Sequence, residues 1–406
     1  MKVIVLGGGA SGMMAALTAA EDPANQVTLL ERQSRLGRKL LATGNGRCNL
    51  SNIHADLSHY HGQNPNFAGY ALSFFSVEQT LAFFQELGLF TLTEPSGKVY
   101  PFSDQANSVL DVLRFALQHR GVNVVCGCEV TAIERKAGGY RLHCQEQIYF
   151  ADRVILACGG SAGGKLGGTD LGYRLLRSLG HSITPLSPSL VQIKTETDCI
   201  KGLKGVRADA SITLKRNGRM CAFEEGEIQF TDFGVSGPAI FSISREAALG
   251  GDQVLLLDLI RPMTEEETFE FLKKKQQSGS QLPLEDFLTG LLHNRLGRII
   301  LSTMGYSLER LTESLSEEDL RRIAHGIKFY PIPVTGVMGM DQAQVTAGGV
   351  HTEEFDARTL ESKKYPGLYV TGELFDIDGD CGGYNLQWAW SSGRLAGCLR
   401  KTGENK

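Results

Sequence analysis

The chain lacks the features that mark membrane proteins, secreted proteins and general nucleic-acid binders. None of the uncharged apolar runs among its 406 residues approaches the ~18–20 residues of a membrane-spanning helix. Met1-Lys2 leads directly into the first predicted strand, so we expect no signal peptide. The formal net charge is only −4, which argues against nucleic-acid binding by the whole surface and leaves local patches open.

Cysteine pairing is also absent from the sequence pattern. The nine cysteines are an odd number without paired spacing, and Cys126-x-Cys128 matches neither a redox pair nor a metal knuckle. We therefore expect a protein of the reducing cytoplasm, with free thiols and no metal site. A length of 406 residues exceeds one ordinary core, so two or three domains are expected.

The most informative motif stands at the start of the chain. Residues 2–6 are predicted to form a buried parallel strand, which leads into Gly7-Gly8-Gly9-Ala10-Ser11-Gly12 and a helix to about residue 20. In such a motif the first glycine permits a tight turn, the second lets the backbone approach a pyrophosphate, and the third allows helix and strand to pack closely. The helix N-terminus offers free N–H groups to phosphates.

A second apolar run, 27–30, ends on Glu31, about 20 residues after the glycines. The Glu31 carboxylate can accept hydrogen bonds from ribose hydroxyls and would repel a 2′-phosphate. The site therefore favours FAD or NAD over NADP. The segment 32–47 follows with five basic residues and no acid, and its glycines could wrap an anionic ligand.

The rest of the chain divides by pattern. Amphipathic helices are predicted at 71–87 and 106–120, then strands at 122–125, 129–133, 140–144, 147–150 and 152–156, the last leading into a glycine turn. The sequence contains neither a second Gly-x-Gly-x-x-Gly nor a Cys-x-x-Cys. This excludes the architecture of disulfide reductases that have two Rossmann domains.

An inserted domain is expected in the middle of the chain. Strands are predicted at 190–193, 210–214, 222–230 and 253–260, and helical segments at 264–277, 284–301 and 316–327. The predicted fold is α/β: a discontinuous Rossmann-like FAD-binding domain (1–189 and 336–406) with an inserted β-barrel and helical domain (190–335). Basic residues between 194 and 219 form either a solvated face or a local RNA site.

The C-terminal part restores the nucleotide-domain pattern. Segments 343–350 and 365–373 are apolar strands ending in glycine turns, the second of which places an acid after Gly372. In FAD proteins with a split nucleotide domain, such an acid binds the ribityl chain. The N-terminus of the following helix then stabilises negative charge on the flavin pyrimidine ring.

Together these motifs resemble a known family. The opening fingerprint combines with GRKLLATGNGRCN at 37–49, FTDFGVSGPA at 230–239, VTAGGV at 345–350 and GELFDIDGDCGGYNLQWAWSSG at 372–393. Over essentially the whole chain, this set resembles the BaiN-like (YhiN-like) NAD(P)/FAD-dependent oxidoreductases, also called aminoacetone-oxidase-type flavoproteins. The resemblance implies FAD contacts at Gly7, Gly9, Ser11, Gly12, Glu31, Arg32, Lys39, Val130, Ala157, Gly159, Gly372, Glu373, Asn385 and Gln387. Glu373 departs from many FAD proteins, which have Asp at this position.

The resemblance implies an FAD-dependent oxidoreductase with non-covalent FAD, most simply one that reduces a C=C or similar bond of a small ring substrate with hydride from transiently bound NAD(P)H. A flavin amine oxidase and a flavin-dependent reductase of RNA uracil remain as alternatives. For a proton donor the ligand-facing segments offer Cys48, Asp378 and Tyr384. The sequence distinguishes none of these three from structural residues.

Overall fold

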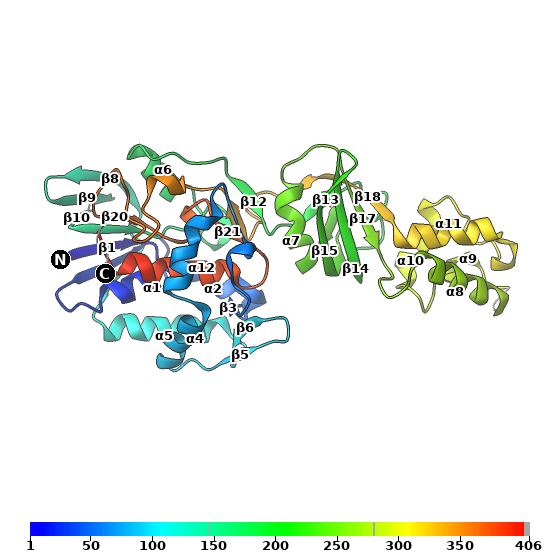
Figure 1. The fold of residues 1–406 in the computed structure, drawn as a ribbon, viewed down its shortest axis with the longest axis horizontal. Coiled ribbons are helices and arrows are strands. Elements are labelled where there is room, and N and C mark those ends of the chain that lie inside the picture. Colours follow the sequence, from blue (N-terminus) through cyan, green and yellow to red (C-terminus); the bar gives the residue numbers. More distant parts are fainter. Residues whose placement is uncertain (146, 279–280, 402–406) are drawn as a thin grey trace. The chain divides into compact units, whose positions relative to one another are not determined.

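The computed structural model describes residues 1–145, 147–278 and 281–401, which form two compact units (Figure 1). The first unit comprises Met1–Ser187 and Gln344–Lys406, and the second comprises Pro188–Ala343. The first unit is therefore discontinuous in sequence. Each unit has its own core of buried apolar side chains. In the described ranges, no helix has both the length and the apolar character that crossing a membrane requires.

The core of the first unit is a parallel sheet with strand order β20-β11-β1-β2-β7. Its strands are β1 (Lys2–Leu6), β2 (Gln26–Glu31), β7 (Asn123–Cys126), β11 (Arg153–Leu156) and β20 (Leu368–Val370). The C-terminal segment thus supplies an edge strand beside β11, and β1 lies in the centre. Ligands of such sheets bind at the carboxyl ends of the strands, where β1, β2 and β11 all end near one another.

The helices of this unit include a close pair from opposite ends of the chain. Helix α12 (Tyr384–Gly397) packs against α1 (Ala10–Ala19) because two glycines, Gly393 and Gly397, face it. A Cβ on either glycine would lie 2.5 Å from an α1 atom, so only glycine permits this approach. The remaining helices are α2 (Arg38–Ala42), α3 (Gly69–Phe74), α4 (Val77–Glu86), α5 (Ala106–His119) and α6 (Leu171–Ser178).

Smaller sheets complete this unit. One is β10-β9-β8, one is β3-β6-β5, and one pairs β21 with β4. Their strands are β3 (Ser51–Asn52), β4 (Tyr60–His61), β5 (Thr91–Thr93), β6 (Lys98–Pro101), β8 (Val130–Lys136), β9 (Gly139–Cys144), β10 (Gln147–Ala151) and β21 (Asp378–Gly379). In the sequence, the short strand β12 (Ser187–Ser189) begins at the last residue of this unit's first segment, and β19 (Val345–Ala347) lies near the start of its second segment.

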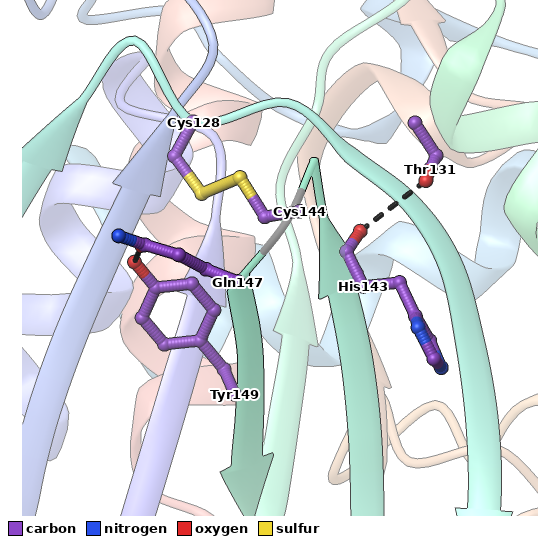
Figure 2. The surroundings of a disulfide bond; sticks show 6 residues. All are labelled: Cys128, Thr131, His143, Cys144, Gln147 and Tyr149. Atoms are coloured by element: carbon purple, nitrogen blue, oxygen red, sulfur yellow. Dashed lines mark hydrogen bonds between the residues drawn. A yellow bond between two sulfur atoms is a disulfide. The ribbon is translucent and has the colours of Figure 1, made fainter.

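The expectation of free thiols is wrong at one place. The structure records a disulfide between Cys128 and Cys144, whose Cα atoms are 5.9 Å apart (Figure 2). The register of β8 against β9 sets Val130 opposite Cys144 and thereby brings Cys128 close. Sequence spacing could not show this pairing, because it depends on the hairpin register. In the ranges that the structure describes, the other seven cysteines form no disulfide.

The second unit contains a closed barrel with strand order β13-β16-β15-β14-β17-β18 (Figure 1). Its strands are β13 (Ile193–Thr195), β14 (Arg207–Arg216), β15 (Arg219–Phe230), β16 (Gly234–Ser236), β17 (Gln253–Asp258) and β18 (Tyr330–Val337). Helix α7 (Pro238–Ala247) packs on β15, and a helical part contains α8 (Glu265–Ser278), α9 (Leu284–Phe287), α10 (Asn294–Thr303) and α11 (Glu317–Lys328). The predicted combination of a barrel and helices is confirmed.

Three predicted elements are wrong in detail. The helix expected at 71–87 is two helices, because Ser76 forms a capping box with Gln79 and starts α4. The helix expected at 284–301 is interrupted after α9, where Gly290 has φ +85°. The strand expected at 190–193 begins only at Ile193.

Candidate functional site

The glycine loop after β1 has the geometry that a dinucleotide requires. Gly7 has φ +110°, and a Cβ there would lie 2.3 Å from the Ala157 carbonyl oxygen. A Cβ on Gly12 would lie 1.8 Å from the Gly7 carbonyl oxygen. A Cβ on Gly9 would meet no atom within 4 Å. Gly7 and Gly12 therefore let segments of the protein pack closely, whereas Gly9 borders open space.

The start of α1 leaves hydrogen-bond donors beside that space. Gly9 is the N-cap of the helix and provides no side-chain cap. Among the described residues, the N–H groups of Gly9, Ala10 and Ser11 have no hydrogen-bond acceptor. Free donors and the positive end of the helix dipole favour an anionic ligand. The open cradle and its donors fit the pyrophosphate of FAD.

Glu31 stands at the end of β2, as predicted, and is fixed by two backbone groups. Its Oε2 accepts a 2.7 Å hydrogen bond from the Gly8 N–H, and its Oε1 accepts one of the same length from the Gln33 N–H. Each carboxylate oxygen keeps a further lone pair. The carboxylate is therefore oriented beside the glycine loop and can still accept a bond from a ribose hydroxyl.

Three segments that lie far apart in the sequence meet at Glu373. Its Oε2 is 2.7 Å from Lys39 Nζ, and its Oε1 accepts a 2.8 Å hydrogen bond from the Thr346 N–H. A Cβ on Gly160 would lie 2.3 Å from Thr346 Oγ1, so the turn after β11 closes on the same place. Lys39 and Glu373 remain partly accessible, with side-chain exposures of 31% and 19%.

Other predicted FAD residues lie around the same strand ends. A Cβ on Gly372 would lie 2.7 Å from Ser11 Oγ, so these two positions are neighbours. The Ala157 N–H donates to the Leu6 carbonyl oxygen at the end of β1, and a Cβ on Gly159 would meet open space. Val130 is buried at the start of β8, near the disulfide.

Arg32, Asn385 and Gln387 make their polar contacts within the protein. Arg32 donates a 2.9 Å hydrogen bond to the Gly167 carbonyl oxygen. The Asn385 amide bonds both the N–H and the carbonyl oxygen of Gly379. Gln387 is fully buried and joins helix α12 to its neighbours through Ser51, Thr80 and the Phe75 carbonyl oxygen, and it also bonds Ser391 within the helix. The structure gives Gln387 a packing role that the resemblance did not indicate.

The three candidate proton donors differ in accessibility. Cys48 is fully buried, and burial raises the pKa of its thiol to about 12, so it stays protonated away from solvent. Asp378 is also fully buried. Burial raises the pKa of Tyr384, whose ring stacks on His59 with centroids 4.2 Å apart. The structure thus places His59 in contact with a candidate that the sequence identified.

The sequence analysis did not identify the cluster of ionisable side chains next to the contact between His59 and Tyr384. Asp380 Oδ2 lies 2.9 Å from His59 Nδ1, and Asp380 Oδ1 lies 2.6 Å from His61 Nε2. No local pattern connects residues 59–61 with position 380, because the pairing of β4 with β21 brings them together. In the part of the chain that is described, no group of three or more His, Cys, Asp or Glu side chains is arranged to hold a metal.

The basic residues between 194 and 219 are partly neutralised. Three of them form ion pairs: Lys204 with Asp232, Arg207 with Glu227 and Arg216 with Glu246. The carboxylates beside these cations reduce the local positive charge that a phosphate would meet. In the loop 32–47, Arg47 likewise pairs with Glu94 and Asp104.

The chain is similar over nearly its whole length to a family model and to two characterised relatives. Residues 1–399 match the model of the HI0933-like protein Rossmann domain. The chain is 39% identical over 401 residues to a 3-dehydro-bile acid delta(4,6)-reductase of Clostridium scindens, covering 98% of each chain. It is 29% identical over 392 residues to a ribosomal RNA dihydrouridine synthase of Escherichia coli, covering 96% of this chain and 95% of that one.

Solved structures with a similar chain path are more distant in sequence. A quinol fumarate reductase of Escherichia coli is 17% identical with a TM-score of 0.49, covering 98% of this chain and 69% of that one. A 3-ketosteroid delta1-dehydrogenase of Sterolibacterium denitrificans is 13% identical with a TM-score of 0.46, covering 98% of both. The family match spans nearly the whole chain. The chain therefore belongs to the HI0933-like protein Rossmann domain family, and it is an FAD-dependent oxidoreductase.

Proposed function

We propose that this oxidoreductase reduces a C=C bond in a ring of a small-molecule substrate, with hydride supplied by NADH or NADPH. The observation that carries the proposal is the 39% identity, over 98% of both chains, to a reductase that by its name acts on the delta(4,6) positions of a 3-dehydro-bile acid. Non-covalently bound FAD would supply the hydride-transfer chemistry, and the protein would supply binding, orientation and electrostatics.

The chain's own residues have separable tasks in this proposal. Gly9 and the first turn of α1 hold the pyrophosphate, and Glu31 holds the ribose of the adenosine half. Glu373, paired with Lys39, orients the ribityl chain. The start of α12 offers its N–H groups and dipole to the pyrimidine ring. The sequence contains no second dinucleotide fingerprint. We therefore propose that NAD(P)H and the substrate bind in turn at one shared site beside the flavin.

RNA is a less supported substrate. The 29% identity to a ribosomal RNA dihydrouridine synthase also fits reduction of a ring C=C bond. Three of the basic residues that would hold RNA are, however, in ion pairs. No observation on the described residues favours the amine oxidase alternative.

Anaerobic stopped-flow spectroscopy tests the proposal. We expect NADH or NADPH to bleach the flavin band, and a 3-oxo-4,6-diene bile acid to restore it in a second mixing. Initial-rate plots at several NAD(P)H concentrations should be parallel, because the nicotinamide leaves before the acceptor binds. Restoration by uracil-containing ribosomal RNA alone would move the assignment to the RNA alternative. Bleaching by an amine, but not by NAD(P)H, would move it to the oxidase.

A further inference from the structure

His59, His61 and Asp380 form one hydrogen-bonded cluster, which we call the histidine pair and its carboxylate. Each carboxylate oxygen has its own imidazole partner, at 2.9 Å for His59 Nδ1 and 2.6 Å for His61 Nε2. Strand pairing produces this arrangement. The Asp380 N–H donates to the His59 carbonyl oxygen, and residues two apart in an extended chain point to the same side.

The cluster lies at the beginning of α12. The His59 ring stacks on Tyr384, the first residue of that helix, and the Tyr60 hydroxyl donates to the Tyr384 carbonyl oxygen. The next residue is Asn385, which the family resemblance places at FAD. The side chains of His59, His61 and Asp380 are 30%, 37% and 31% exposed, so both rings can exchange protons with water.

The carboxylate of this cluster carries a negative charge. Burial pulls the pKa of Asp380 upward, but hydrogen bonds from His61 and His59 hold it below its usual range, so the carboxylate is ionised at neutral pH. An ionised carboxylate stabilises positive charge on an adjacent ring. The other titratable groups nearby are His54, Asp56, Tyr60, Asp378, Cys381 and Tyr384.

Of these groups, Asp56 adds a second negative charge on the His59 side, because hydrogen bonds from Ser58 lower its pKa. Burial raises the pKa of Tyr60 and of Tyr384, so both phenols stay neutral. Around His59, the Asp380 and Asp56 carboxylates are therefore negative and the two phenols are neutral. Such surroundings suit an imidazolium that must give up a proton and then regain it.

We propose that the histidine pair donates the proton of the reductive reaction and that Asp380 positions it. This inference rests on the proposed C=C reduction. Adding hydrogen across that bond places a hydride, with both electrons, on one carbon and a proton on its neighbour. The hydride derives from NAD(P)H. The proton comes from an imidazolium N–H bond, which breaks as the new C–H bond forms, and water then returns a proton to the neutral ring.

The test uses the FAD-loaded protein in four further forms: His59→Asn, the double variant His59→Asn with His61→Asn, Asp380→Asn, and His54→Asn as the matched control. Stopped-flow measurements record flavin reduction by NAD(P)H and its reoxidation by a 3-oxo-4,6-diene bile acid, between about pH 5.5 and 9. NMR of labelled histidine rings in the same samples records protonation without turnover.

We expect the double variant to be reduced by NAD(P)H at the wild-type rate and reoxidised about 10²- to 10⁴-fold more slowly. The wild-type reoxidation rate should fall as pH rises through the range in which histidines lose their proton, and the double variant should lack that fall. Asp380→Asn should move the fall to lower pH, because the imidazolium loses its carboxylate. His54→Asn should behave as wild type. In the NMR titration, at least one of the two rings should become protonated within the pH range of the kinetic fall.

Two results would overturn the proposal. One is a double variant with wild-type reoxidation and pH profile; the other is an NMR titration in which both rings stay neutral across the working range. A wild-type enzyme that NAD(P)H reduces but the diene does not reoxidise gives a different pattern. That pattern would contradict the proposed C=C reduction itself and therefore also the proton donor assigned to it.

Discussion

The Lys39 ammonium and the Glu373 carboxylate form a 2.7 Å salt bridge between residues 334 positions apart in the sequence. The same carboxylate accepts the Thr346 N–H at 2.8 Å. The basic loop after β2, the strand β19 and the motif that follows β20 therefore converge on one side chain. Each of these segments carries part of the family resemblance. The Glu373 carboxylate holds them together, because it contacts both Lys39 and Thr346.

Glu373→Gln should weaken FAD binding while leaving the fold intact. The substitution keeps the side-chain shape but removes the charge that faces Lys39. Loss of a charge-assisted hydrogen bond is worth about 1.5–3 kcal/mol, or roughly 10- to 150-fold in affinity. Fluorescence titration of the apoprotein with FAD measures the change, with Asp111→Asn on the surface of α5 as the control. Wild-type affinity in Glu373→Gln would place the ribityl chain elsewhere.

Two glycines of the opening loop should respond in opposite ways to the same substitution. Gly9→Val places its side chain in open space, so the apoprotein should fold normally and fail to retain FAD. Gly12→Val drives a Cβ to 1.8 Å from the Gly7 carbonyl oxygen, so the fold itself should be destabilised. Thermal unfolding of the apoproteins separates the two effects, and the absorbance of acid-released FAD reports binding. Retention of yellow colour by Gly9→Val would contradict the pyrophosphate assignment.

Gln387→Leu should lower the free energy of unfolding by about 3 kcal/mol or more, because several buried partners of its amide lose their hydrogen bonds. Those partners include the Ser51 hydroxyl, the Thr80 hydroxyl and the Phe75 carbonyl oxygen. Urea unfolding of the apoprotein measures the change, with the exposed Gln118→Leu as control. If stability were unchanged and FAD affinity fell, Gln387 would be the cofactor contact that the resemblance implies.

The sequence predicted best where a site is built from neighbouring residues. The strand, glycine loop and helix at residues 2–20 could be predicted because each requirement is local: a buried run, glycines at fixed offsets and an apolar helix. The same holds for Glu31, whose position follows from the end of the second strand. The capping box at Ser76 was equally local but lay inside a continuous amphipathic pattern, which concealed the break.

Prediction failed where distant segments meet or where a local rule is overridden. His59, His61 and Asp380 carry no joint signal, because only the pairing of β4 with β21 unites them. Strand β18 contains Pro331 and Pro333, which argue against an inner strand, yet it lies between β17 and β13 in the closed barrel. Both prolines occupy exposed alternate positions, so the residues between them still fill the core.

His181 should make the protein sensitive to mild acid. Its ring is buried and stacks on Phe355, with Nδ1 2.5 Å from Glu354 Oε2 and Nε2 3.1 Å from Ser362 Oγ. A neutral ring protonated at Nδ1 satisfies both contacts, donating to the carboxylate and accepting from the hydroxyl. Burial lowers the pKa of His181, although the bond to Glu354 opposes this shift.

The unfolded chain therefore binds a proton at His181 more readily than the folded protein does. The stability that this neutral ring provides is complete above the ordinary histidine pKa of about 6.5 and is lost as pH falls through the lowered value of the folded state. Hydrogen bonds also lower the pKa of Glu354, despite its burial, and that carboxylate acts in the same direction at still lower pH.

Urea unfolding at successive pH values should show wild-type stability declining below neutrality. His181→Asn, which keeps a donor to Glu354 but cannot titrate, should be less stable at neutral pH and nearly flat over the same range, whereas exposed His119→Asn should follow wild type. Parallel curves for wild type and His181→Asn would show that acid acts elsewhere in the molecule.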